Sequence, residues 1–131
     1  MMNILSKFKI IFYLSNILLI IEYLFPGSLL GCILFNDCKI QPQITRDFII
    51  SSNHFYSFFI LTYLGLISYN SNKQKKFLLL YLLCLAVILE LFHLIIPNRN
   101  FEYQDLIGNV FGVAVVLLLN YFIRNYVKFK N

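Results

Sequence analysis

The most constraining feature of the sequence is a pair of long apolar segments, residues 77–96 and 106–123, joined by a short polar stretch. Glu90 and His93 lie inside the first segment, and Asn109 lies inside the second. An apolar solvent penalises charged and polar groups heavily, so such groups inside membrane segments are candidate functional residues by default. The fold must therefore bring polar partners to these side chains.

The composition indicates a membrane protein. Of the 131 residues, 60% are hydrophobic and 13% are charged, and the mean hydropathy is +0.74. Soluble domains are about half apolar and about a quarter charged. The length predicts a single domain over residues 1–131. The net charge of +5 does not indicate nucleic-acid binding, because the lysines lie at the ends of apolar segments, where they act as topology signals and contact anionic headgroups.

Four apolar segments predict an all-α bundle of four transmembrane helices, at residues 10–25, 48–69, 77–96 and 106–123. The first segment ends at Pro26-Gly27 without a small-residue cleavage site, so we expect an uncleaved span. Residues 28–35 are apolar but too short to cross, which predicts a segment that lies in the interface or re-enters slightly. Pro97 is expected to end the third helix, and Asp105 is expected to cap the fourth.

The positions of lysine and arginine predict the orientation of the bundle. With both termini in the cytoplasm, eight of these residues are cytoplasmic, and only Lys39, Arg46 and Arg99 are outside. This asymmetry follows the positive-inside rule. The cysteines allow two interpretations. Cys32 and Cys38 share a loop and could pair in an oxidising compartment, or both could be unpaired small apolar residues.

This orientation places polar side chains from all four segments near the outer side of the membrane. We expect a ligand-binding pocket there, formed by His54, Glu90, His93, Arg99, Asp105 and Asn109, with Glu22 nearby. Glu90 is the hardest to explain as a structural residue, because a lone buried carboxylate costs several kcal/mol. Its expected partners are Arg99, His93 and His54.

Most of these residues also have a structural interpretation. His54 could be a packed, hydrogen-bonded side chain, and Asn109 could join two helices by hydrogen bonding. Gly108 and Gly112 are expected to allow close helix packing. If the site is catalytic, the candidate catalytic residues are Glu90, His54, His93 and Asp105. The same two histidines and two carboxylates could bind a divalent metal, although no metal-binding motif indicates it.

The pattern Glu90-x-x-His93, Pro97-x-Arg99 and Asp105-x-x-x-Asn109-x-x-Gly112 resembles the signature of the VanZ-like family. That family comprises small bacterial integral membrane proteins and is named for a protein linked to teicoplanin-type glycopeptide resistance. The resemblance implies a multi-pass protein of the bacterial cytoplasmic (inner) membrane with a role in the cell envelope or in antibiotic resistance. His93 stands where the family typically has Gln, and Ile50-Ser51 stands where an Asp-Lys pair is typical.

Three functions are compatible with these residues. The first is binding or modulation of a lipid-linked or glycopeptide-type ligand, with Arg99 engaging phosphate or carboxylate. The second is a membrane-embedded hydrolase or transferase that acts on a lipid-linked substrate, with Glu90 as general base. The third is a structural or assembly role. The sequence identifies no cofactor and leaves the ligand, the oligomeric state and the role of residues 28–47 open.

Overall fold

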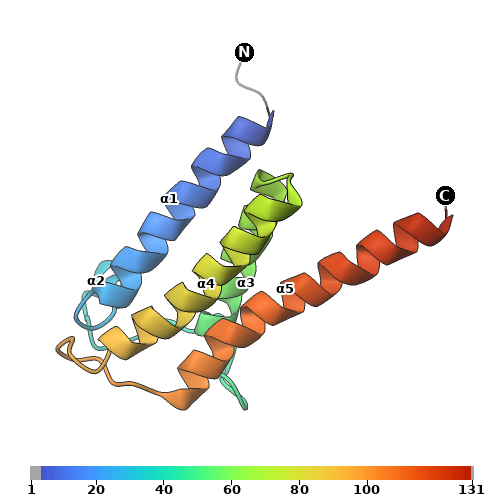
Figure 1. Cartoon of the computed structure of the whole chain (residues 1–131). Helices are drawn as coiled ribbons and strands as arrows, with labels where there is room; N and C mark the ends of the chain where they lie inside the picture. Colours follow the sequence, from blue (N-terminus) through green and yellow to red (C-terminus); the bar gives the residue numbers. More distant parts are fainter. Residues whose placement is uncertain (1–3, 131) are drawn as a thin grey trace.

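The computed structural model describes residues 4–130 and contains, within that range, five α-helices and no strand. The helices are α1 (Ile4–Leu24), α2 (Leu29–Phe35), α3 (Ser52–Ser68), α4 (Asn72–Phe92) and α5 (Tyr103–Lys130). The helices α1, α3, α4 and the first half of α5 pack together, and the second half of α5 projects beyond them (Figure 1). The prediction of an all-α protein is confirmed.

The chain breaks after α1 at Pro26-Gly27, as predicted. Gly27 has a φ of +94°, a backbone conformation that only glycine adopts at little cost. Ser28 then caps α2, because its hydroxyl oxygen accepts the Gly31 N–H at 3.0 Å. The result is a short helix at 88° to α1, at the end of the bundle that carries the longer loops (Figure 1).

The start of α3 at Ser52 differs from the predicted start at residue 48. The Asp47 carboxylate accepts the Ser52 N–H at 2.7 Å and thereby satisfies a free donor at the helix N-terminus. Phe48 and Ile49 lie outside the helix, where their side chains are 90% and 71% exposed. The predicted start at residue 48 was wrong, because the hydrogen bond between the Asp47 side chain and the local backbone competes with extension of the helix toward residue 48.

Both ends of α4 lie earlier in the chain than the predicted segment of residues 77–96. Ser71 caps the start by accepting a backbone N–H at 3.2 Å. Residues 93–96 form turns in place of a helix, and the Ile95 N–H donates to the Phe92 carbonyl three residues before it. Pro97 lies beyond these turns, so the prediction that it ends the helix was wrong.

Close packing joins α5 to α3, its main neighbour. A Cβ atom added at Gly112 would lie 2.5 Å from the Phe55 carbonyl oxygen, and one added at Gly108 would lie 2.8 Å from the Ser51 carbonyl oxygen. The two backbones approach this closely because both positions lack a side chain, as expected for small residues at a helix contact. The contact places the first turns of α5 beside the first turns of α3.

Within residues 4–130, α5 is the one helix that is long and apolar enough by itself to cross a membrane. Residues 7–24 of α1 meet the same criterion only together with α2, as a bent pair. The 17 residues of α3 span about 26 Å, less than the roughly 30 Å of a bilayer core. Lysines occupy the first turns of α4. The helices therefore do not establish the predicted bundle of four transmembrane helices.

The glycine contact predicts a difference between two alanine substitutions. Gly112→Ala should lower the free energy of unfolding by about 1–3 kcal/mol, because the new methyl group meets backbone atoms that cannot move aside. Gly65→Ala is the matched control, since its methyl group would meet mainly the flexible end of Leu78. Thermal unfolding of both variants in detergent measures the difference. Equal melting temperatures would contradict the close-packed contact.

A disulfide joins Cys32 to Cys38 in the structure, and Cys84 is free and exposed. The paired alternative for the two loop cysteines is therefore the one that the structure contains. We expect thiol labelling of the unreduced protein, followed by mass spectrometry, to modify Cys84 alone. After reduction, all three cysteines should react. Labelling of Cys32 or Cys38 without reductant would contradict the pairing.

Candidate functional site

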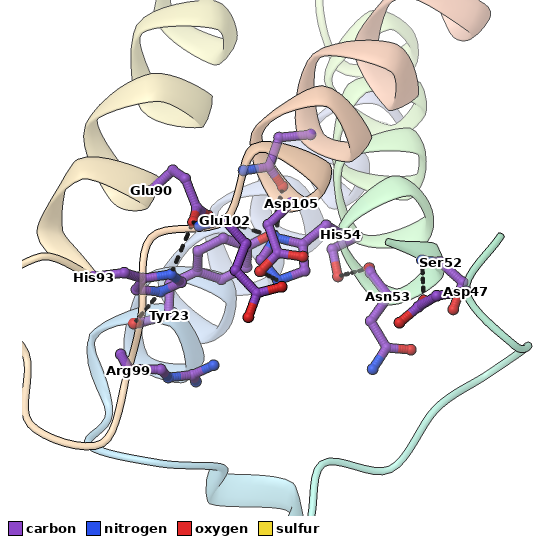
Figure 2. Close-up of polar contacts among 12 residues, drawn as sticks. Tyr23, Asp47, Ser52, Asn53, His54, Glu90, His93, Arg99, Glu102 and Asp105 are labelled. Carbon is purple, nitrogen blue, oxygen red and sulfur yellow. Dashed lines mark hydrogen bonds and ion pairs between the residues drawn. The ribbon is translucent and has the colours of Figure 1, made fainter. Parts of the chain in front are cut away.

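The polar side chains gather at one end of the bundle, where α1 and α4 end and α3 and α5 begin (Figure 2). Tyr23 comes from the end of α1, His54 from α3, Glu90 from α4 and Asn109 from α5, and all four are buried. The chain reverses direction at each loop, which brings the ends of all four long helices to this one place. The site is therefore a junction of four helices.

Glu90 is completely buried in the last turn of α4. Its Oε1 accepts the backbone N–H of Glu102 at 3.1 Å and lies 3.3 Å from Nδ1 of His93. Its Oε2 has no hydrogen-bond partner among the described residues. Because α4 stops at Phe92, Glu90 lies closer to the helix end than the predicted segment of residues 77–96 implied.

His93 is 2% exposed and follows the last residue of α4. Its Nε2 lies 3.1 Å from the Tyr23 carbonyl oxygen, which can only accept, so Nε2 carries a hydrogen and donates it. A neutral ring would then turn the lone pair of Nδ1 toward the Glu90 carboxylate. The 3.3 Å contact is a hydrogen bond when a second proton lies between His93 and Glu90.

His54 contacts a partner with each ring nitrogen and is 4% exposed. Its Nδ1 lies 3.0 Å from the Tyr23 hydroxyl and 3.1 Å from Oδ1 of Asn109. Since the Tyr23 hydroxyl donates its own hydrogen to Asn109 at 2.7 Å, Nδ1 must be the donor in these contacts. The tautomer with hydrogen on Nδ1 leaves a lone pair on Nε2, which lies 3.4 Å from Oδ2 of Asp105.

Asn109 fixes this arrangement through the other end of its amide. Its Nδ2 donates to the Ala86 carbonyl oxygen at 3.3 Å, so its Oδ1 must face Tyr23 and His54. Asn109 thereby joins α5 to α1, α3 and α4, which agrees with its interpretation as a hydrogen-bonding residue between helices. The same contacts orient the His54 ring.

Tyr23 was not among the predicted site residues. It is buried, it bonds to Asn109 and its ring stacks on that of His93 with centroids 5.7 Å apart. One signal for it was present, because a tyrosine inside an apolar segment needs a hydrogen-bond partner for its hydroxyl. That signal is not specific to Tyr23, because the chain has several tyrosines and a tyrosine at the membrane interface gives the same signal.

Asp105 is the third residue of α5 and not its N-cap, so the predicted capping role was wrong. The helix begins earlier, at Tyr103, and the Asp105 side chain is directed at His54 at 3.4 Å (Figure 2). A carboxylate in the first turn of a helix is still favoured by the helix dipole. Its side chain is half-buried and borders the open space outside the junction.

Arg99 does not pair with Glu90, contrary to the prediction. Its Nε donates to the Phe25 carbonyl at 3.2 Å and its Nη2 donates to the Glu22 carbonyl at 2.7 Å, so it binds the free carbonyl end of α1. Burial lowers the pKa of Arg99, while the charge of Glu22 raises it, and a guanidinium remains charged at neutral pH. Three of its five N–H groups remain for other partners.

An open cleft of about 330 Å³ lies beside Arg99, outside the junction. Its lining combines basic Lys39 and Arg99 with acidic Glu102 and Asp105, together with His93. A smaller cavity of about 110 Å³ also borders Arg99 and is lined in addition by Tyr23 and His54. The cleft is therefore polar and contains both signs of charge.

The structure brings together five of the six predicted ligand-binding residues, and it places Arg99 next to them without a direct bond. His54, Glu90 and Asp105 each offer one potential metal-ligand atom within 4.8 Å of the other two. His93 does not belong to that group. The junction can hold a proton between Glu90 and His93, accept a cation between its carboxylates, and present a guanidinium to the cleft.

The junction predicts a large effect of removing one hydroxyl. Tyr23→Phe should lower the free energy of unfolding by about 1–3 kcal/mol, because Asn109 and His54 lose a buried partner. Tyr63→Phe, on the exposed side of α3, should change it little. Thermal unfolding of both variants tests this. A Tyr23→Phe protein as stable as the wild type would exclude Tyr23 as a member of the network.

No protein-family model, no curated protein and no solved structure matches this chain. The resemblance to the VanZ-like family therefore stays a prediction that rests on the spacing of Glu90, Arg99, Asp105, Asn109 and Gly112.

Proposed function

We propose that this protein is a VanZ-like integral membrane protein of the bacterial cell envelope that binds an anionic headgroup in the cleft. The ligand class is a lipid-linked or glycopeptide-type molecule with a phosphate or carboxylate group. A role in antibiotic resistance, as in the namesake of the family, follows from the resemblance alone. The position of Arg99 in the cleft carries the binding proposal, and the surface of the helices supports the membrane location.

The membrane location is supported by the side chains that the fold leaves uncovered. Leu14 and Leu18 of α1, Leu80 of α4 and Leu118 and Phe122 of α5 are among many large apolar residues that are exposed. Exposed apolar surface on this scale is unusual for a soluble monomer and suits contact with lipid. The described ends of the chain lie at the opposite end of the bundle from the cleft, which fits cytoplasmic termini and an outward-facing site (Figure 1).

The single observation that carries the binding proposal is the position of Arg99. Its guanidinium is held by the carbonyls of Glu22 and Phe25, so its direction is fixed before a ligand arrives. Its remaining N–H groups suit the paired oxygens of a phosphate or carboxylate. Lys39 borders the same cleft and adds a second positive charge. Glu102 and Asp105 can accept hydrogen bonds from hydroxyl or amine groups of the ligand.

A comparison of two lipids tests this proposal. The wild-type protein in detergent should bind undecaprenyl phosphate at least about 10-fold more tightly than undecaprenol, because only the first carries the anion that Arg99 recognises. Arg99→Gln and Lys39→Gln should each reduce that preference. Lys73→Gln, at the opposite end of the bundle, is the matched control and should keep it. Native mass spectrometry measures all four proteins.

Because the Arg99 side chain also holds α1 in place, loss of binding in Arg99→Gln can result from misfolding. Lys39→Gln removes a positive charge from the same cleft and provides an independent test. A phosphate preference that survives both Arg99→Gln and Lys39→Gln would contradict the proposal. So would the absence of any preference in the wild type. Binding of teicoplanin by the same four proteins tests the glycopeptide alternative, with the same expected order of affinities.

One observation favours a second candidate, a hydrolase or transferase that acts on the same lipid-linked ligand. Glu90, His54 and Asp105 cluster in the junction, and Asp105 also borders the cleft, so the three could move protons or activate water next to a bound ligand. Release of inorganic phosphate from the bound lipid by the wild type, and none by Glu90→Gln, would establish that candidate. In a purely structural role, Glu90→Gln would lower stability and binding in parallel.

A further inference from the structure

We propose that His54, Glu90 and Asp105 form a binding site for one divalent transition-metal ion. One ligand atom from each residue lies within 4.8 Å of the other two. His54 and Glu90 are buried and Asp105 is half-buried. One imidazole and two carboxylates are a ligand set that suits Zn²⁺ or Mn²⁺, and three protein ligands leave a further position for water or substrate.

The first support is the unpartnered oxygen of Glu90. Oε1 is satisfied by the Glu102 N–H and by His93, whereas Oε2 is buried and has no hydrogen-bond partner within residues 4–130. Nδ1 of His54 lies 3.9 Å from Oε2, which is too far for a hydrogen bond. A buried carboxylate oxygen without a partner is costly and points to a missing cation or donor.

The second support is the tautomer of His54. Because Nδ1 donates to the Tyr23–Asn109 pair, Nε2 presents a lone pair, and it lies 3.4 Å from Oδ2 of Asp105. A lone pair and a carboxylate oxygen at this distance repel each other unless a proton or a metal ion lies between them. A metal ion held by His54, Glu90 and Asp105 would supply the positive charge and would give Oε2 of Glu90 a partner.

His93 is assigned a positioning role. Both of its ring nitrogens are in use, with Nε2 on the Tyr23 carbonyl and Nδ1 on Oε1 of Glu90. His93 therefore fixes the Glu90 carboxylate through Oε1 and leaves Oε2 free for the ion. Residues that bind a metal are commonly oriented by such an outer partner. This narrows the sequence-based hypothesis of a four-residue metal site to three ligands.

The ion would lie next to the proposed headgroup site, since Asp105 borders the cleft that Arg99 and Lys39 line. A metal there would share the negative charge of a phosphate with Arg99. This role of the ion rests on the proposed function, whereas binding of the ion rests on the three side chains alone.

Metal binding is tested on the full-length protein in detergent, stripped with chelator and titrated with Zn²⁺. We expect one Zn²⁺ per chain by elemental analysis after gel filtration, and a higher melting temperature with Zn²⁺ than without. His93→Gln should weaken binding by about 10- to 100-fold, as loss of an outer partner does. Glu90→Gln and Asp105→Asn should weaken it more and lose the thermal shift.

The matched control is Glu22→Gln, which removes a nearby carboxylate outside the cluster and should keep the full Zn²⁺ content. Asp105→Asn, at a half-buried position, guards against the case in which Glu90→Gln fails to fold. Without metal, Glu90→Gln should be at least as stable as the wild type, because a neutral amide replaces the unpartnered oxygen. No Zn²⁺ in the wild type, or full Zn²⁺ in Asp105→Asn, would overturn the site.

The two proposals fail separately. Arg99→Gln should retain Zn²⁺ while it loses the preference for undecaprenyl phosphate. If the wild type prefers that lipid but binds no Zn²⁺, the metal site is excluded and the proposed function stands. If Zn²⁺ binds at the three residues but leaves the affinity for undecaprenyl phosphate unchanged, the shared role in headgroup binding is excluded.

Discussion

The burial of one carboxylate, that of Glu90, determines how the end of this bundle is built. A buried charge must be paired or hydrogen-bonded. The chain supplies the partners from both sides: His93 from the turn after α4, and the Glu102 N–H from the loop that leads into α5. His93 in turn donates to the Tyr23 carbonyl at the end of α1. The path of the α4–α5 connection therefore depends on this one side chain.

A second constraint is the close contact between α3 and α5. Because Gly108 and Gly112 carry no side chain, the first turns of α5 reach the backbone of α3. That approach places Asp105 beside His54 and brings Asn109 within hydrogen-bonding distance of Tyr23. Apolar packing of Phe58, Leu61, Leu82 and Val113 fills the bundle above the junction. The polar network and the glycine contact thus depend on each other.

Some features of the site followed from the sequence and others did not. A polar group inside an apolar segment can be recognised from spacing alone, so His54, Glu90, His93 and Asn109 could be singled out together. Arg99 was assigned the wrong partner, because a long side chain on a loop can reach many acceptors. The free carbonyls at the end of α1 satisfied it instead. Tyr23 was missed because its role exists only when three helices meet.

By itself, the sequence determined the helical class, the break at Pro26-Gly27 and the concentration of polar side chains at one end of the helices. The first two are local, since they depend on hydrophobic periodicity and on backbone conformation, and the third follows from where the polar residues stand in each apolar segment. The tertiary structure decided where α3, α4 and α5 begin and end, which nitrogen of His54 carries hydrogen, and which oxygen of Glu90 is left without a partner. Those outcomes depend on contacts between residues far apart in the chain, and spacing along one segment carries no information about them.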